Sequence, residues 1–156
     1  MTVQKEFTDK NGNYDILLKH VADRKLRRII DVGAWWGPWS LFWQPHAESL
    51  EIFEPNKRIL PMLEHNISTY DNCTLHKTAL GESRGTVSMG YDTHSGTNHV
   101  TDPKGDTGIN TLDSYNFDNV DVIKIDVEGY EMPVLRGAEH TIMTNSPMIQ
   151  IEGNKS

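Results

Sequence analysis

The sequence predicts an α/β fold, a single domain with a mostly parallel sheet between layers of helices. The first observation behind this prediction is that short apolar runs alternate with segments of helical spacing, the order that produces parallel strands joined by crossovers. The second is the segment 29–37, where an apolar run ends in Asp31 and is followed by two glycines and then Pro38. A strand, a glycine turn and a helix start in this order are typical of folds that bind nucleotide-like ligands.

In the first half of the chain, helices and strands alternate regularly. The expected strands are short runs of branched apolar residues, and the expected helices carry apolar residues three and four positions apart. We treat residues 1–27 as a lead-in. The predicted elements are a helix over 14–21, a strand over 28–32, a helix after Pro38, a strand over 50–54, a helix over 59–67 and a strand over 73–79.

The alternation stops after residue 81 and resumes near residue 120. A short strand is expected over 85–89, followed by a polar loop over 90–110 that is rich in Gly, Asp, Thr, Ser, Asn and His. Long loops in compact domains are often functional, so we expect this loop to lie near the site where the molecule that the protein acts on, its acceptor, binds. A strand over 120–126, a helix over 130–140 and a strand over 147–152 complete a sheet core that spans residues 28–152.

Length and charge exclude several classes of function. The 156 residues correspond to one domain, and the net charge of −7 disfavours general binding to nucleic-acid backbones. No apolar run reaches the length of a membrane span, and the first residues do not resemble a signal peptide. Cys73 is the single cysteine, which excludes an intrachain disulfide. We therefore expect a cytoplasmic protein that does not associate with membranes.

The glycine turn differs from the dinucleotide-binding fingerprint at one position. Trp35 stands where that fingerprint needs a glycine to let the backbone approach a pyrophosphate, so a nicotinamide-dependent dehydrogenase is a distant alternative. Glu54 ends the next strand, at the distance where such folds place an acid that accepts hydrogen bonds from ribose hydroxyls. The turn and Glu54 together predict a nucleoside site.

A long motif in the last third of the chain indicates the family. Residues 122–131 and 134–138 resemble the segment K-I-D-V-E-G-x-E-x-x-V-L-x-G-A of the FkbM family of S-adenosylmethionine-dependent methyltransferases. The segments 31–34, 53–56, 78–81 and 111–113 match the same family in the same order, so the resemblance covers most of the chain from Ile29 to Glu152.

The resemblance implies a Rossmann-like class I methyltransferase fold, a three-layer sandwich with S-adenosylmethionine at the carboxyl ends of its strands. We predict no metal-binding residues. The cofactor-binding residues that the resemblance implies are Asp31, Gly33 and Gly37 on the methionine side, Glu54 at the ribose, Ala79 and Leu80 at the adenine, and Ala34, Trp35, Pro55 and Asp126 beside them.

Three side chains are candidates for the catalytic step. Methyl transfer requires that an acceptor be positioned and its proton removed or accommodated. Asp126 and Glu128 alternate at a strand end and could face one cleft, where one could act as the base or both could hold a divalent cation. The alternative for Glu128 is that it caps the following helix. His94 in the polar loop is a further candidate base, with solvent exposure as its alternative.

The expected function is methylation of an oxygen, or less favourably a nitrogen, on a small or carbohydrate-like acceptor. The alternative is an S-adenosylmethionine-binding protein or partner subunit without transferase activity. The family continues its sheet with two further strands, whereas this sequence ends after the fifth core strand. That strand would be an exposed edge, which predicts a homo-oligomer that covers it.

Overall fold

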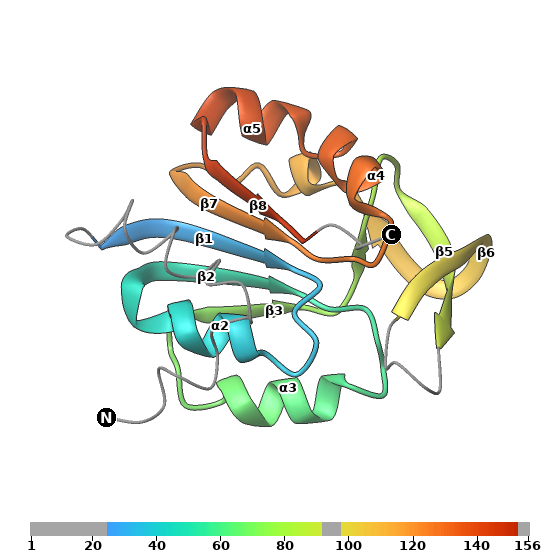
Figure 1. Ribbon diagram of the computed structural model, residues 1–156, viewed down its shortest axis with the longest axis horizontal. Helices are drawn as coiled ribbons and strands as arrows, with labels where there is room; N and C mark the ends of the chain where they lie inside the picture. Colours follow the sequence, from blue (N-terminus) through green and yellow to red (C-terminus); the bar gives the residue numbers. More distant parts are fainter. Residues whose placement is uncertain (1–24, 92–97, 153–156) are drawn as a thin grey trace.

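The computed structural model describes residues 25–91 and 98–152, so the helix expected over 14–21 lies outside the described residues. A five-stranded sheet forms the centre, and each pair of neighbouring strands in it is parallel (Figure 1). The strand order is β3-β2-β1-β7-β8, the doubly wound arrangement, which confirms the α/β prediction. The strands are β1 Leu26–Val32, β2 Ala47–Phe53, β3 Cys73–His76, β7 Val120–Ile125 and β8 Met148–Ile151.

Helices cover both faces of this sheet and make the three layers. Successive residues of β1 point to opposite faces: Ile29 packs in the cluster that contains α2 and α3 residues, whereas Ile30 packs in the cluster that contains Val134 of α4. No described helix is long and apolar enough to cross a membrane. The helices are α2 Pro38–Trp43, the 3-10 turns η2 Gln44–His46 and η3 Leu112–Tyr115, α3 Leu60–Ile67, α4 Glu131–Arg136 and α5 Glu139–Asn145.

The segment predicted as a polar loop over 90–110 instead forms most of a β-hairpin. β5 (Gly85–Tyr91) pairs antiparallel with β6 (Asn98–Asn110), and β6 also pairs with the short strand β4 (Ala79–Leu80) to form a second sheet. An antiparallel ladder is held by main-chain hydrogen bonds, so a polar sequence can form it when a partner strand is adjacent. Among its described side chains, the second sheet buries a small cluster around Ala79, Val87 and Ile109.

The strand predicted over 73–79 is shorter in the structure, because the chain passes from the main sheet to the second sheet within this range. β3 stops at His76, and Ala79 begins the second sheet after a two-residue break. The chain therefore leaves the main sheet at its carboxyl side and enters the hairpin, which lies beyond the arrowheads of the main strands in Figure 1.

The helix predicted over 130–140 is divided into α4 and α5. Asp113 causes the division: its main-chain N–H donates to Gly137 O at 2.9 Å, and its carboxylate accepts the N–H groups of His140 and Thr141 at 3.0 and 2.8 Å. A carboxylate that accepts free N–H groups starts a new helix. Gly137 also lies so close to Gly81 that a Cβ there would be 1.9 Å from the Gly81 carbonyl oxygen.

Candidate functional site

The carboxyl ends of β1, β2 and β7 are tied together into one edge. Asp126, just after β7, donates its main-chain N–H to Val32 O at 3.0 Å, and Gly33, just after β1, donates to Phe53 O at 3.0 Å. The strand order reverses between β1 and β7, because the chain moves outward in opposite directions on either side of them. In doubly wound sheets this switch point is where ligands bind.

The glycine turn is shaped by contact with the protein's own backbone. Gly33 has φ +79°, and a Cβ at this position would lie 1.9 Å from the carbonyl oxygen of Asp126. Gly37 has φ +95° at the start of α2, and a Cβ there would lie 2.9 Å from Leu63 Cδ1. Trp35 has φ +54°, a left-handed conformation that is uncommon for a side chain of this size. The left-handed backbone conformation therefore favours glycine at both positions, and at Gly33 the approach of the Asp126 carbonyl adds a second reason.

Glu54 links the end of β2 to the glycine turn. Its Oε2 accepts the N–H of Trp35 at 2.8 Å, its Oε1 accepts the N–H of Asn56 at 2.8 Å, and the residue is 4% exposed. Burial raises the pKa of Glu54 above its ordinary value, although the two amide donors oppose this shift. Each carboxylate oxygen keeps capacity for a second donor.

A buried ionic cluster lies beneath the turn. Lys124 Nζ donates to Gly33 O at 2.8 Å and lies 3.1 Å from Asp31 Oδ1 and 3.6 Å from Asp126 Oδ2; these four residues are the Lys124 cluster. Asp31 is completely buried, and its Oδ2 also accepts the Ser40 hydroxyl at 2.6 Å. The carboxylate of Asp31 therefore lies below the turn, where it contacts protein groups.

The sequence analysis did not identify Lys124. Its signal was present in the sequence, because this lysine lies between two isoleucines near the end of β7, and the structure leaves it 5% exposed. Burial alone would lower the pKa of Lys124, but the charges of Asp31 and Asp126 outweigh burial and raise it. The lysine is therefore a charged partner of these carboxylates.

Trp35 and Asp126 are among the predicted site residues with side chains that reach solution. Trp35 is 48% exposed, and the side chain of Asp126 is 30% exposed. Glu128 is half-buried with φ +52°, and the carboxylate that accepts the N–H of Gly129, at 2.9 Å, belongs to Glu131. Asp126 is thus the carboxylate of the Lys124 cluster that a ligand can reach.

The remaining predicted residues occupy varied positions. Ala34, Ala79 and Leu80 are buried at 2%, 6% and 3% exposure, and Pro55 is half-buried beside Glu54. His94 lies outside the described residues. Within the parts of the chain that the structure describes, no group of three or more His, Cys, Asp or Glu side chains could hold a metal ion.

Comparison with known proteins agrees with this architecture. The model of the methyltransferase FkbM domain matches residues 31–155. The fold is similar to that of the methyltransferase FkbM from Methylobacillus flagellatus KT, with a TM-score of 0.61, 20% identity and coverage of 82% of this chain. It is also similar to an rRNA methylase from Streptococcus thermophilus, with a TM-score of 0.54, 13% identity and coverage of 87% of this chain.

The match in length is partial. This chain spans 33% of the Methylobacillus structure and 64% of the Streptococcus structure, and at these identities the likeness concerns the fold. A comparison with curated proteins gives no significant match.

Proposed function

The chain belongs to the FkbM methyltransferase domain family, and from this membership and the geometry of its site we propose that it binds S-adenosylmethionine and methylates an oxygen of a small or carbohydrate-like acceptor. The observation that carries the proposal is the partly exposed carboxylate of Asp126, which lies beside the glycine turn at the switch point of the sheet. Glu54, on the neighbouring strand end, supplies a second acceptor for the same ligand.

The residues present fit the nucleoside half of this cofactor. Two adjacent ribose hydroxyls need an acceptor, and the oxygens of Glu54 each have one lone pair left after binding Trp35 and Asn56. The half-exposed indole of Trp35 offers an apolar surface next to that carboxylate. Ala79 and Leu80, where the chain enters the second sheet, provide the apolar surroundings that an adenine ring requires.

The reaction needs little acid–base chemistry. The sulfonium of the bound cofactor supplies an activated methyl group, whose transfer is an in-line displacement with a neutral thioether as leaving group. The chain's own task is to hold the acceptor hydroxyl in line and to take its proton. Asp126 is the reachable carboxylate for this proton, and Glu128, two residues on, would orient the acceptor.

Charge and topology support a small acceptor. A chain with a net charge of −7 repels polyanions such as nucleic acids. The second sheet packs against Tyr130, which follows the Asp126–Gly129 segment directly, so the β5–β6 hairpin would form one wall of the acceptor pocket. His94 lies in the connection between β5 and β6 and would be the alternative base.

Calorimetric titration with S-adenosylmethionine, S-adenosylhomocysteine and NAD tests the cofactor. We expect both sulfur compounds to bind and NAD not to bind. Glu54→Ala should weaken S-adenosylhomocysteine binding by about tenfold or more, since two charge-assisted hydrogen bonds are lost. Glu48→Ala is the matched control, because Glu48 is an exposed acid at the other end of the same strand. Absence of binding by either sulfur compound would contradict the proposal.

The same titrations separate transfer from binding. Asp126→Asn should still bind S-adenosylhomocysteine measurably, though more weakly because Asp126 also lies at the cofactor site, and should lower the rate of methyl transfer by about 10²–10⁴-fold, the usual contribution of a general base. The acceptor can be found by screening sugars, polyols and hydroxylated metabolites for uptake of labelled methyl groups. Tight cofactor binding with no transfer to any of them would favour a binding protein or partner subunit without activity.

A further inference from the structure

Lys124 connects three separate segments of the chain at the candidate site. The ammonium contacts the main chain of the glycine turn through Gly33 O at 2.8 Å, and the carboxylates of Asp31 and Asp126 at 3.1 and 3.6 Å. The ammonium donates a hydrogen bond to Gly33 O and forms ion pairs with the two carboxylates. Lys124 is buried, with its ammonium beside these three protein oxygens.

This geometry points to Lys124 as the positioning residue that shapes the site for the amino-acid half of S-adenosylmethionine. The inference rests on the proposed function, because it concerns how the same site is held in shape. Lys124 holds two groups at once, the Gly33–Ala34 peptide and the Asp126 carboxylate. Neither group has the same orientation without it.

The Gly33–Ala34 peptide is held from both sides. Its carbonyl accepts from Lys124 Nζ, and its N–H donates to Phe53 O at 3.2 Å. A planar peptide that is hydrogen-bonded at both its oxygen and its nitrogen cannot rotate freely, so the direction in which the chain continues into the turn is fixed. Gly33 also presses against the Asp126 carbonyl, which leaves the turn no room to shift toward β7.

The Asp126 carboxylate is held from one side and open on the other. Its Oδ2 lies 3.6 Å from the ammonium, while the side chain keeps 30% of its surface exposed. A site group is most precise when a buried second group locks its rotamer. Burial alone would lower the pKa of Lys124, but the charges of Asp31 and Asp126 raise it, and the ammonium acts on these carboxylates by attraction.

Glu54 has one hydrogen bond that the glycine turn does not supply. Its carboxylate accepts the main-chain N–H of Asn56 as well as that of Trp35 in the turn, and β1 lies between β7 and β2, the strand that Glu54 follows. Removal of Lys124 should therefore weaken recognition of the amino-acid half more than recognition of the nucleoside half. S-adenosylhomocysteine contains both halves, whereas adenosine contains the nucleoside half alone.

The test compares the affinities of these two compounds by calorimetry. Lys124→Met leaves Asp31 charged, buried and without its ionic partner, which can prevent folding. The double variant Asp31→Asn/Lys124→Met removes both charges and keeps the inference testable. Lys25→Met, at an exposed position before β1, is the control for loss of a lysine.

We expect the folded double variant to bind S-adenosylhomocysteine at least tenfold more weakly and adenosine within about twofold of the wild type. Asp31→Asn alone, which keeps the ammonium on Gly33 and Asp126, should lose less than the double variant. Equal loss for both compounds, or no loss, would show that Lys124 is only structural and would overturn the inference. A wild-type chain that binds neither compound would overturn the proposed function itself.

Discussion

The two ends of the central sheet both join basic and acidic side chains, but the carboxyl end has an ion pair, Lys124–Asp31, in which both partners are buried. At the carboxyl end, the side chains of Lys124 and Asp31 are 6% and 0% exposed. At the amino end, Arg27 pairs with Asp121 at 2.7 Å while its side chain stays 54% exposed, and Arg28 pairs with Asp118, which is 83% exposed. The ion pairs at both ends have N–O distances of about 3 Å, so the two ends differ mainly in how much of the charged side chains is exposed to water.

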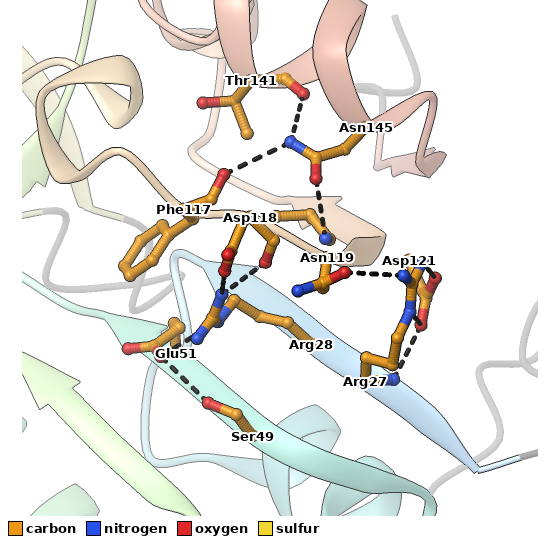
Figure 2. A network of polar contacts seen from close by, with 11 residues as sticks. Arg27, Arg28, Ser49, Glu51, Phe117, Asp118, Asn119, Asp121, Thr141 and Asn145 are labelled. Atoms are coloured by element: carbon orange, nitrogen blue, oxygen red, sulfur yellow. Dashed lines mark hydrogen bonds and ion pairs between the residues drawn. The ribbon is translucent and has the colours of Figure 1, made fainter.

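The amino-end network holds chain connections together (Figure 2). Arg28 of β1 lies between Glu51 of β2 and Asp118, with its guanidinium 5.2 Å from the centre of the Phe117 ring. Asn145 at the end of α5 accepts from the N–H of Val120 and donates to Phe117 O. At the amino end, these charged groups therefore connect strands and loops. At the carboxyl end, charged groups of the same kinds lie where we expect a ligand to bind.

The largest loss of stability should come from removing one partner of the buried Lys124–Asp31 ion pair. Asp31→Ala leaves the Lys124 ammonium buried without its closest carboxylate, and the loss of one partner of a buried pair typically costs about 3–5 kcal/mol. Urea unfolding at pH 7 measures the free energy of unfolding. The double variant Asp31→Ala/Lys124→Met should recover part of this loss. A cost below about 1 kcal/mol for Asp31→Ala would mean that burial does not distinguish the two ends.

An intermediate loss of stability is expected when Glu51 is replaced, because its own side chain is buried while its partner Arg28 stays partly exposed. Its carboxylate accepts from His76 Nε2 at 2.8 Å and from the Ser49 hydroxyl at 3.0 Å. Burial alone would raise the pKa of Glu51, but the hydrogen bonds from His76 and Ser49 and the charge of Arg28 lower it. A lowered pKa in the folded state stabilises the protein above the unfolded pKa of about 4.3, and this contribution disappears as the pH falls through the folded pKa.

Glu51→Gln should therefore cost about 1–2 kcal/mol at pH 7, and this difference from the wild type should shrink on acidification below about pH 4. Unfolding curves for both proteins across this pH range give the measurement. A difference that is constant from pH 7 into acid would show that the hydrogen bonds do not depend on the charge of Glu51.

The smallest effect is expected for Arg27 at the exposed end. Exposed ion pairs are screened by solvent and salt, so Arg27→Ala should leave the midpoint of thermal unfolding nearly unchanged, at low salt and at 0.5 M salt alike. Differential scanning calorimetry at the two salt concentrations measures it. A clear drop in Tm that salt removes would indicate that the amino end is electrostatically as important as the carboxyl end.

Much of the framework follows from local sequence. Ile29 and Ile30 belong to a short apolar run whose residues point to opposite faces, and the helices on those faces follow from apolar spacing, so the α/β fold could be predicted. Asp31, Glu54 and Asp126 could be placed at strand ends because each directly ends or follows an apolar run.

The errors share one cause. A strand is predicted over 85–89, where β5 lies, but the segment that forms β6 is predicted as a loop, because its stability comes from pairing with β5, which a composition of Gly, Thr and Asp does not indicate. The division between α4 and α5 depends on Asp113, which lies 27 residues before His140. Each of these features depends on residues that are distant in sequence.

The sequence by itself determined the order of elements, the glycine turn and the acids at the strand ends, because these patterns depend on residues a few positions apart. Only the tertiary structure decided that Gly33 must be glycine to pass the Asp126 carbonyl, and that Lys124 reaches the Gly33 carbonyl 91 residues away in the sequence. The physical reason is that hydrophobic periodicity is a local property, whereas desolvation and close backbone approach arise only when β1 and β7 lie side by side.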